Sequence, residues 1–365
     1  MSDGATSRST RTNRPRFASA VVIVLCALSA ACGNTLGSAK KKASFRALQG
    51  LPGESVAYAV SADGRTVTGL ARDSAVAFRW EATTGMMKSL GRLPGFDSAA
   101  GLGVSVDGFA IVGSSGPPNA GAPFMWTARA GMVALKALPG GNGVGSASGV
   151  SADGTVIAGW TLGPDQGAKA VVWNDDGEPT EIAPDTSASY AVAMNPTRVV
   201  VAGNSFDDTS SEPFRWQSAR GLMLLGDVAN GTRHTFANAI STDGRVICGQ
   251  SVLATGLRTA CCWSADRGWT ILPTPAGAES NALGVNLDGS VVVGAVDGEA
   301  AIWNRSGLHS VAASLEEHGI ALPGGTWQLV SANGVTPDGQ TIVGSALAPD
   351  GLETAWIAVV PAKRS

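Results

Sequence analysis

The stretch GVSADGTVIAG, residues 149–159, decides the fold because near copies of it recur along the chain. Residues 103–113 have the sequence GVSVDGFAIVG, and residues 334–344 have the sequence GVTPDGQTIVG. The final glycine of the motif returns at steps of 44 to 50 residues, at Gly69, Gly113, Gly159, Gly203, Gly249, Gly294 and Gly344. A tryptophan follows each of them, at Trp80, Trp126, Trp173, Trp216, Trp263, Trp303 and Trp356. Two independent markers with one period are typical of a repeat architecture.

Each copy predicts four short strands. The second copy contains the apolar runs AAGLGVS (99–105), AIVG (110–113), APFMWTA (122–128) and GMVALKALPG (131–140). The first two runs are joined by Asp-Gly, a common hairpin signature, because glycine accepts the positive φ of a tight turn. Four strands in a period of about 46 residues describe one blade of a β-propeller.

The two ends of the repeat region complement each other. The last copy stops at its third strand, ETAWIAVVP (353–361), and residues 44–53, SFRALQGLPG, match a fourth strand that has no copy of its own. If the early strand completes the last blade, the ring closes and no blade is left with an open edge there. We therefore expect an all-β fold over residues 44–361, a seven-bladed β-propeller of four-stranded blades closed by the mature N-terminal strand.

Two copies depart from the pattern. In the fourth copy, NPTR (195–198) replaces Asp-Gly and predicts a longer, differently shaped hairpin. In the sixth copy, Leu308, Val311 and Leu315 have helical spacing, which predicts a short helix that ends at Gly319.

Residues 1–32 have the pattern of a secretion signal. Four arginines precede an apolar run from Phe17 to Cys32 that is short for a membrane span. The sequence LSAAC (28–32) resembles the processing box of bacterial lipoproteins, although Ser29 stands where leucine is usual. That resemblance implies that Cys32 is lipidated and, with Gly33 after it, that the protein is an outer-membrane lipoprotein. The alternative is plain signal cleavage near Ala31 and a periplasmic or extracellular protein.

The remaining segments are short. Residues 33–43 are small and polar with three lysines, and we expect a flexible tether there; residues 362–365 form a C-terminal tail. The net charge of −3 and the absence of a basic patch with interleaved aromatic residues argue against nucleic acid as a partner.

The copies also resemble bacterial extracellular HAF-type repeats. The resemblance rests on AFRW (77–80), PFRW (213–216) and the LPG triplets at 51, 93 and 138, and it covers residues 44–361. The histidine of that family is absent, its place being taken by Val76, Ala122, Ala170, Glu212, Thr259, Glu299 and Leu352. The resemblance implies export and a repeat fold, but no particular activity.

Most residues that suggest chemistry have a structural explanation. We expect the aspartates of the Asp-Gly pairs to shape turns rather than to bind calcium, since each turn offers one carboxylate: Asp63, Asp107, Asp153, Asp243, Asp288 and Asp338. We expect the repeated tryptophans to pack between blades. Trp160 and Trp327 depart from the repeat, and they are either platforms for a sugar or peptide, or packing at the rim.

The histidines, loop acids and cysteines complete the candidates. His234, His309 and His318 have no metal-ligand spacing, and the acids Asp207, Asp208, Glu316 and Glu317 show no fixed pairing, so we assign no catalytic residue, no metal site and no cofactor. Cys248 and either Cys261 or Cys262 lie on strands expected to be adjacent, which allows a disulfide. A buried free thiol at Cys261 is the alternative.

These observations favour a monomeric, exported and lipid-anchored binding or surface-display module without catalytic activity. Its expected partner is a cell-envelope protein or glycan of unspecified identity. The main alternative is a cell-envelope carbohydrate-active enzyme, a hydrolase or lyase, which would gather nonrepeating acids, histidine or tyrosine at one end of the channel. A purely structural envelope protein is a third possibility.

Overall fold

The structure is a computed structural model that describes residues 41–117, 120–197, 199–207 and 209–361. The secretion signal, Cys32, residues 33–40 of the tether and the tail 362–365 therefore lie outside the described residues, as do Arg198 and Asp208. The described part begins with Lys41, which is the first residue of a compact unit. Within it the chain forms 28 strands and one short helix.

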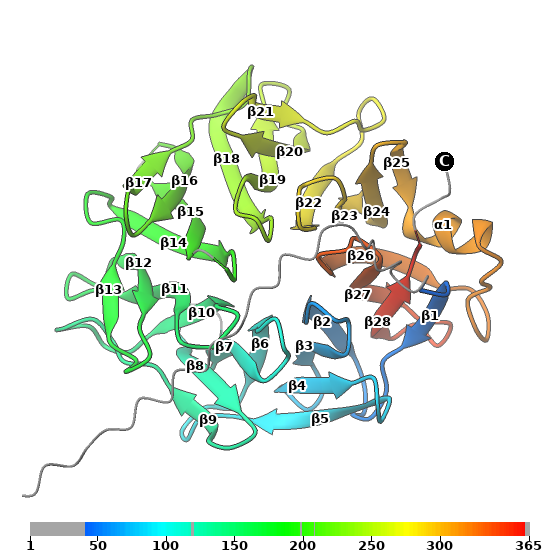
Figure 1. The fold of residues 1–365 in the computed structure, drawn as a ribbon, viewed down its shortest axis with the longest axis horizontal. Helices are drawn as coiled ribbons and strands as arrows, with labels where there is room; N and C mark the ends of the chain where they lie inside the picture. The colour runs from blue at the N-terminus through cyan, green and yellow to red at the C-terminus, as the bar shows by residue number, and fades with distance from the viewer. Residues whose placement is uncertain (1–40, 118–119, 198, 208, 362–365) are drawn as a thin grey trace, which may run out of the picture. The chain divides into compact units, whose positions relative to one another are not determined.

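The strands form four-stranded antiparallel sheets arranged around a common axis (Figure 1). Each sheet is named here by the strand that lies nearest the axis. From the axis outward, its strands are called inner, second, third and outer. The first three sheets contain β2 (Ser55–Val60), β3 (Thr66–Ala71), β4 (Val76–Glu81) and β5 (Met86–Gly91); β6 (Ala99–Val104), β7 (Ala110–Ser115), β8 (Ala122–Thr127) and β9 (Gly131–Ala134); β10 (Gly145–Val150), β11 (Ile157–Leu162), β12 (Ala168–Trp173) and β13 (Pro179–Glu181).

The next two sheets are joined by a single parallel bridge between Ser211 and His234, which makes them formally one sheet of eight strands. They contain β14 (Ala188–Met194), β15 (Val200–Phe206), β16 (Ser211–Gln217) and β17 (Gly221–Leu224); β18 (Gly231–Ile240), β19 (Val246–Leu253), β20 (Arg258–Ser264) and β21 (Gly268–Ile271). The β22 sheet contains β22 (Ser280–Val285), β23 (Val292–Val296), β24 (Glu299–Asn304) and β25 (Gly307–Ser310). The all-β prediction with four-stranded units is thereby confirmed.

The last sheet is built from both ends of the described chain. It contains β26 (Gln328–Val335), β27 (Thr341–Leu347) and β28 (Glu353–Val359), and its fourth strand is β1 (Ser44–Ala47). Strand β1 runs antiparallel to β28, with Ser44 opposite Val359 and Ala47 opposite Trp356.

A bulge in every inner strand explains the repeated glycine. The pairing of inner and second strands skips one inner residue, for example Leu102 between Gly101 and Gly103. The bulge brings the preceding carbonyl close to the second strand: a Cβ atom at Gly113 would lie only 1.9 Å from the carbonyl oxygen of Ala100. The same conflict recurs at the other copies, so the position requires glycine because a side chain has no space.

The Asp-Gly pairs belong to a turn that is stabilised by a hydroxyl group. In the β10 sheet the Ser151 hydroxyl donates to Asp153 Oδ1 (2.6 Å) and accepts from the backbone N–H of Val156 (2.9 Å). Gly154 has a φ of 74°, which a residue with a Cβ rarely adopts. The aspartate thus shapes the turn by local hydrogen bonds, as we expected from the spacing.

The fourth copy has a turn of the same length but different chemistry. Residues 195–199 join β14 to β15, just as five residues join the inner and second strands of the β2 sheet, so the predicted longer hairpin is wrong. The buried side chain of Asn195 replaces the serine, because its Oδ1 accepts from the backbone N–H of Val200 (2.7 Å). The positive φ is at Val199 (47°).

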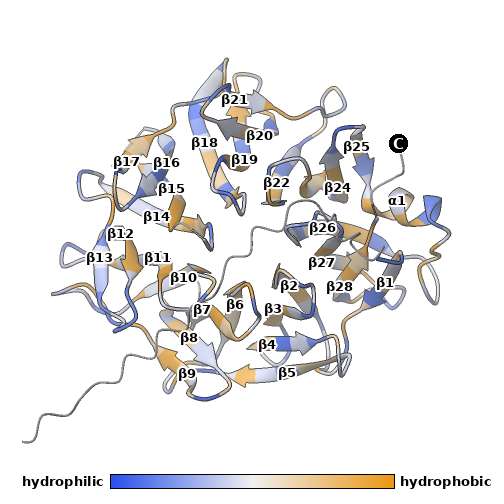
Figure 2. Cartoon of the chain, in the orientation of Figure 1, coloured by the Kyte–Doolittle hydropathy of each residue, from blue (hydrophilic) through white to orange (hydrophobic). Residues whose placement is uncertain are grey.

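The apolar core is distributed between neighbouring sheets. One cluster joins Ala77 and Leu90 of the β2 sheet to Ile111 and Phe124 of the β6 sheet. Figure 2 likewise shows hydrophobic residues on strands of every sheet. Five of the repeated tryptophans are buried: Trp80, Trp173, Trp263, Trp303 and Trp356. Trp80 packs with residues of the β26 sheet and Trp173 with residues of the β6 sheet, in agreement with the prediction that these tryptophans pack between sheets.

The predicted helix is present as α1 (Val311–Glu317), directly after β25. Ser310 caps it, accepting with its hydroxyl the backbone N–H of Ala313, and Gly319 follows its end with a φ of 74°. Val311 and Leu315 are fully buried and pack against the β26 sheet. The helix therefore fills the space between the β22 and β26 sheets at the rim.

Candidate functional site

The sheets present two faces with different loops. The turns between inner and second strands, and those between third and outer strands, lie at one end of the sheets, called the turn face. The connections between sheets and the loops between second and third strands lie at the other end, called the connection face. Because inner strands begin at the connection face and end at the turn face, the position of a residue along its strand tells which face it is near.

The inner strands enclose a channel of about 240 Å³ that is lined mostly by small and aliphatic residues. The bulged residues line it: Tyr58, Leu102, Ser148, Val192, Asn238, Leu283 and Asn333. The Ser148 hydroxyl donates to the Ala191 carbonyl (2.8 Å), and the Asn333 amide donates to the Ala57 carbonyl (2.8 Å). Polar groups of the channel thus tie one sheet to the next instead of converging on a ligand.

A row of aromatic side chains lies close to the connection face. Trp160 on β11 contacts Tyr190 on β14, with ring centroids 5.1 Å apart, and Tyr190 contacts Phe206 on β15 at 5.4 Å. Phe206 contacts Phe236 on β18 at 6.2 Å. All four side chains are half-buried. These four residues, named the aromatic row, connect three consecutive sheets, so the structure brings Trp160 together with rings that sequence reasoning did not single out.

The fold does not require aromatic residues at these positions. The residues equivalent to Trp160 in the other sheets are Leu70, Ser114, Asn204, Gln250, Ala295 and Ser345. Tyr190 and Phe236 occupy one repeat position, which elsewhere holds Val56, Ala100, Ser146, Asn281 and Ser331. The same backbone is built without aromatic rings in the other sheets. An alignment of the copies could have revealed this concentration from the sequence.

Two carboxylates beside the aromatic row are held by hydrogen bonds and an ion pair with residues close to them in sequence. Asp207 accepts hydrogen bonds from the hydroxyl and N–H of Ser210 and from Thr209, and the Ser210 hydroxyl contributes most to lowering its pKa to about 2. The N–H of Gly167 does most to lower the pKa of Asp165, which also pairs with Lys169 (3.1 Å). Both groups therefore stay ionised at neutral pH.

Trp327 lies in a different environment. Its ring contacts Phe45 of β1 edge-on, with centroids 5.4 Å apart, and its indole N–H donates to the Pro323 carbonyl (2.6 Å). It belongs to the apolar cluster between the β22 and β26 sheets. The structure therefore does not bring Trp327 and Trp160 into one site, and it places Trp327 in rim packing.

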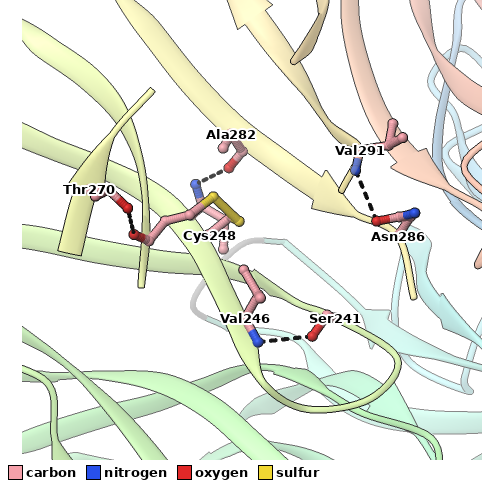
Figure 3. Close-up of a disulfide and its surroundings, with 9 residues drawn as sticks. Ser241, Val246, Cys248, Thr270, Ala282, Asn286 and Val291 are labelled. Atoms are coloured by element: carbon pink, nitrogen blue, oxygen red, sulfur yellow. Dashed lines mark hydrogen bonds between the residues drawn. A yellow bond between two sulfur atoms is a disulfide. The ribbon is translucent and has the colours of Figure 1, made fainter. Parts of the chain in front are cut away.

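The cysteines of the β18 sheet lie on adjacent strands, as Figure 3 shows for the disulfide. Cys248 on β19 stands opposite Cys262 on β20, and their Sγ atoms are bonded. Cys261 points to the other face of the sheet, where it is a fully buried free thiol. Burial raises the pKa of Cys261 far above its ordinary value, so this thiol is unreactive.

The three histidines do not lie in one place, and two of them border a cavity whose lining also includes Glu317 and Asp338. His234 lies at the β16–β18 bridge, whereas His309 and His318 both border a cavity near α1. Among the described residues there is no group of three His, Cys, Asp or Glu side chains that could hold a metal ion. In the same part of the chain no helix has the length and apolarity needed to cross a membrane.

The chain matches no protein-family model and no curated protein. Among solved structures it is similar to the oligogalacturonate lyase of Vibrio parahaemolyticus, with a TM-score of 0.56 and 12% identity over 88% of this chain and 98% of the lyase. It is also similar to the β-propeller domain of the Trilobed protease from Pyrococcus furiosus, with a TM-score of 0.52 and 11% identity over 87% of this chain and 94% of that domain. The fold is a β-propeller.

A third solved structure, TolB, is matched over a smaller part of its own length. TolB from Acinetobacter baumannii matches 85% of this chain with 13% identity and a TM-score of 0.45, and the chain spans only 65% of its length. At these identities the similarities concern the backbone alone. The function of this β-propeller has to be argued from its own residues.

Proposed function

We propose that the protein is a non-catalytic binding module of the cell envelope that binds a glycan on the aromatic row. In this proposal it is exported, processed at the signal and anchored by a lipid on Cys32. The scaffold is a ring of seven blades, closed by β1. Two contacts support closure: β1 pairs with β28, and the Asn333 amide on the β26 sheet donates to the Ala57 carbonyl on the β2 sheet (2.8 Å).

The aromatic row carries the proposal. Four half-buried rings form an unbroken series over three sheets, at repeat positions that other sheets fill with small, aliphatic or polar residues. Aromatic rings are favourable surfaces for the C–H faces of sugar rings. A ligand that spans several sheets would be extended, as an oligosaccharide is.

Both ends of the described chain lie at the turn face. Lys41 lies at the turn face, where its ammonium group contacts Asp338 (2.7 Å) and Thr341 (3.1 Å). Strand β28 ends at the same face, and Pro361 follows it. The first and last described residues of the propeller thus lie at the face opposite the aromatic row.

An enzyme is less well supported. A glycoside hydrolase needs a carboxyl group that can hold a proton at neutral pH. The carboxylates of Asp165 and Asp207 have lowered pKa values and serve their own loops. Burial is the main cause of the raised pKa of Tyr58, the one tyrosine on the channel. Neither the two aspartates nor the tyrosine is therefore suited to proton transfer at neutral pH.

The charge around the row also argues against an acidic sugar polymer. The adjoining loops carry Asp165, Asp185, Asp207 and Asp227, against Lys169 and Arg233. Lys169 is already paired with Asp165. Because the net field is negative, we expect neutral glycans to bind better than oligogalacturonate, the substrate class named for the Vibrio protein.

A binding screen with matched variants tests the proposal. The full chain is tested against neutral oligosaccharides of β-1,4-linked N-acetylglucosamine, peptidoglycan fragments and oligogalacturonate, with the products checked for cleavage. Trp160→Ala should weaken neutral glycan binding about tenfold, because one aromatic contact is lost. Phe109→Ala removes a ring that is 69% exposed on the turn face and should change nothing. Equal affinities of wild type and Trp160→Ala would refute the proposed site, and cleavage would refute the non-catalytic role.

A further inference from the structure

A second cavity, of about 590 Å³, lies on the turn face between the β22 and β26 sheets. It is bordered by α1, by the turn after β24 and by the Asp-Gly turn of the β26 sheet. Its volume is in the range of sites for small molecules. It lies on the opposite face from the aromatic row, so it does not depend on the glycan proposal.

One side of the cavity is apolar. Val291, Ile302, Val360 and Pro361 contribute to its lining, and Ile302 is buried in the core between the two sheets. A hydrocarbon group in contact with these residues would be removed from water, which favours binding in proportion to the area covered.

The lining contains the acids Asp338 and Glu317 and the cation Arg305. Asp338 is neutralised by Lys41, whose Nζ lies 2.7 Å from its carboxylate, and Glu317 is also engaged in an interaction. Arg305 is exposed, and among the described residues it makes no ion pair or hydrogen bond. The guanidinium group is therefore available to a carboxylate, with which it can form two parallel hydrogen bonds.

Two imidazoles, those of His309 and His318, border the same cavity. The Ser306 hydroxyl donates its proton to Asn304 Oδ1 (2.6 Å), so the Nε2 of His309, 2.8 Å from the same hydroxyl oxygen, must carry the proton that it donates. His318 Nδ1 lies 2.8 Å from the Ser314 carbonyl, which can only accept, so Nδ1 carries the proton there. In the neutral form of each ring, the other nitrogen can accept a hydrogen bond from a ligand hydroxyl group.

We propose that this cavity binds an aliphatic hydroxy acid. Its carboxylate would pair with Arg305, its hydroxyl group would donate to an imidazole nitrogen of His309 or His318, and its hydrocarbon chain would cover the apolar side. Nothing is transferred in this proposal; the site binds a small molecule.

Four probes of one chain length test the three parts of the site: 3-hydroxyoctanoate, octanoate, octanol and octylammonium. Calorimetric titration of the full chain should show saturable binding of 3-hydroxyoctanoate, about tenfold weaker binding of octanoate, still weaker binding of octanol and none of octylammonium. Absence of saturable binding by 3-hydroxyoctanoate, or equal affinity for octylammonium, would overturn the proposal.

Substitutions of the lining residues test which side chain contacts which group of the ligand. Arg305→Gln should remove the preference for octanoate over octanol, whereas Arg129→Gln, an exposed arginine in a turn at the same face, should leave the affinities unchanged. His309→Phe combined with His318→Phe should remove the preference for 3-hydroxyoctanoate over octanoate while octanoate still binds. Equal losses in the Arg305 and Arg129 variants would show a general charge effect and contradict the site. Gln340→Trp, which fills the cavity, should abolish binding of every probe.

Discussion

The backbone N–H of Leu48 donates to the carbonyl oxygen of Ala355, 2.8 Å away, and joins the first described strand to the last one. The Leu48 side chain is 3% exposed and lies in the apolar cluster that contains Trp80 and Val343. The N-terminal segment is thus part of the core of the β2 and β26 sheets. Its removal would uncover an edge of β28 as well as apolar surface.

Replacement of Leu48 should therefore destabilise the whole propeller. We expect Leu48→Ala to lower the free energy of unfolding by about 2–5 kcal/mol, the usual cost of emptying a buried leucine site. Urea unfolding followed by tryptophan fluorescence measures the change. Leu352→Ala serves as the control, since Leu352 is 41% exposed and should cost less than about 0.5 kcal/mol. A loss in Leu48→Ala as small as that in the control would mean that the segment around Leu48 does not stabilise the fold.

The glycine of the repeat should tolerate no side chain. At Gly113 a Cβ atom would meet the Ala100 carbonyl oxygen at 1.9 Å, so Gly113→Ala forces the inner strand to move, and we expect a loss of about 3 kcal/mol. Gly131→Ala is the matched control: its φ is +71°, but no atom lies within 4 Å of the added Cβ, so only about 1 kcal/mol of backbone strain is expected. Thermal unfolding of the two variants compares them. A loss at Gly131 as large as that at Gly113 would rule out the steric explanation.

The disulfide should involve Cys262 and not its neighbour. Tryptic digestion without reduction should yield residues 246–258 linked to residues 259–267, and the link should survive Cys261→Ser but disappear in Cys262→Ser. Reduction of the wild type should cost about 3 kcal/mol, because a loop of this length is then released in the unfolded chain. In a Cys248→Ala, Cys262→Ala variant the reductant should have no effect. A link that is lost in Cys261→Ser would contradict the pairing.

The turn of the β10 sheet should contribute to acid sensitivity. The Ser151 hydroxyl, with smaller effects from Thr155, lowers the pKa of Asp153 to about 2, below the value of about 3.9 expected in the unfolded chain. Because the folded pKa is the lower one, this stabilisation is fully present above about pH 4 and is lost as the pH falls toward 2. Asp153→Asn should accordingly flatten the decrease in stability between pH 4 and pH 2. An unchanged pH profile of the variant, measured by urea unfolding, would refute the assignment.

Local patterns made much of the fold predictable. The Asp-Gly turns, the four-stranded units, the helix after Ser310 and the pairing of residues near Leu48 with those near Ile357 all follow from short-range signals or from the arithmetic of the repeat. The fourth turn was mispredicted because Asn195 makes the hydrogen bond of the missing serine, a substitution that spacing alone does not reveal. The bulge that makes Gly113 necessary was also not predicted, because it depends on strand pairing.

The candidate sites depended far more on tertiary structure. The sequence marked Trp160 as an exception to its repeat, and it placed Cys248 near two possible partners. Only the packing of three sheets brings Trp160 into contact with Tyr190 and aligns Phe206 with Phe236, and only the strand register decides that Cys262, not Cys261, faces Cys248. The physical reason is that periodicity reports which residues share a strand or a face. Which side chains meet across two sheets depends on how those sheets twist and pack, which no single segment of the sequence encodes.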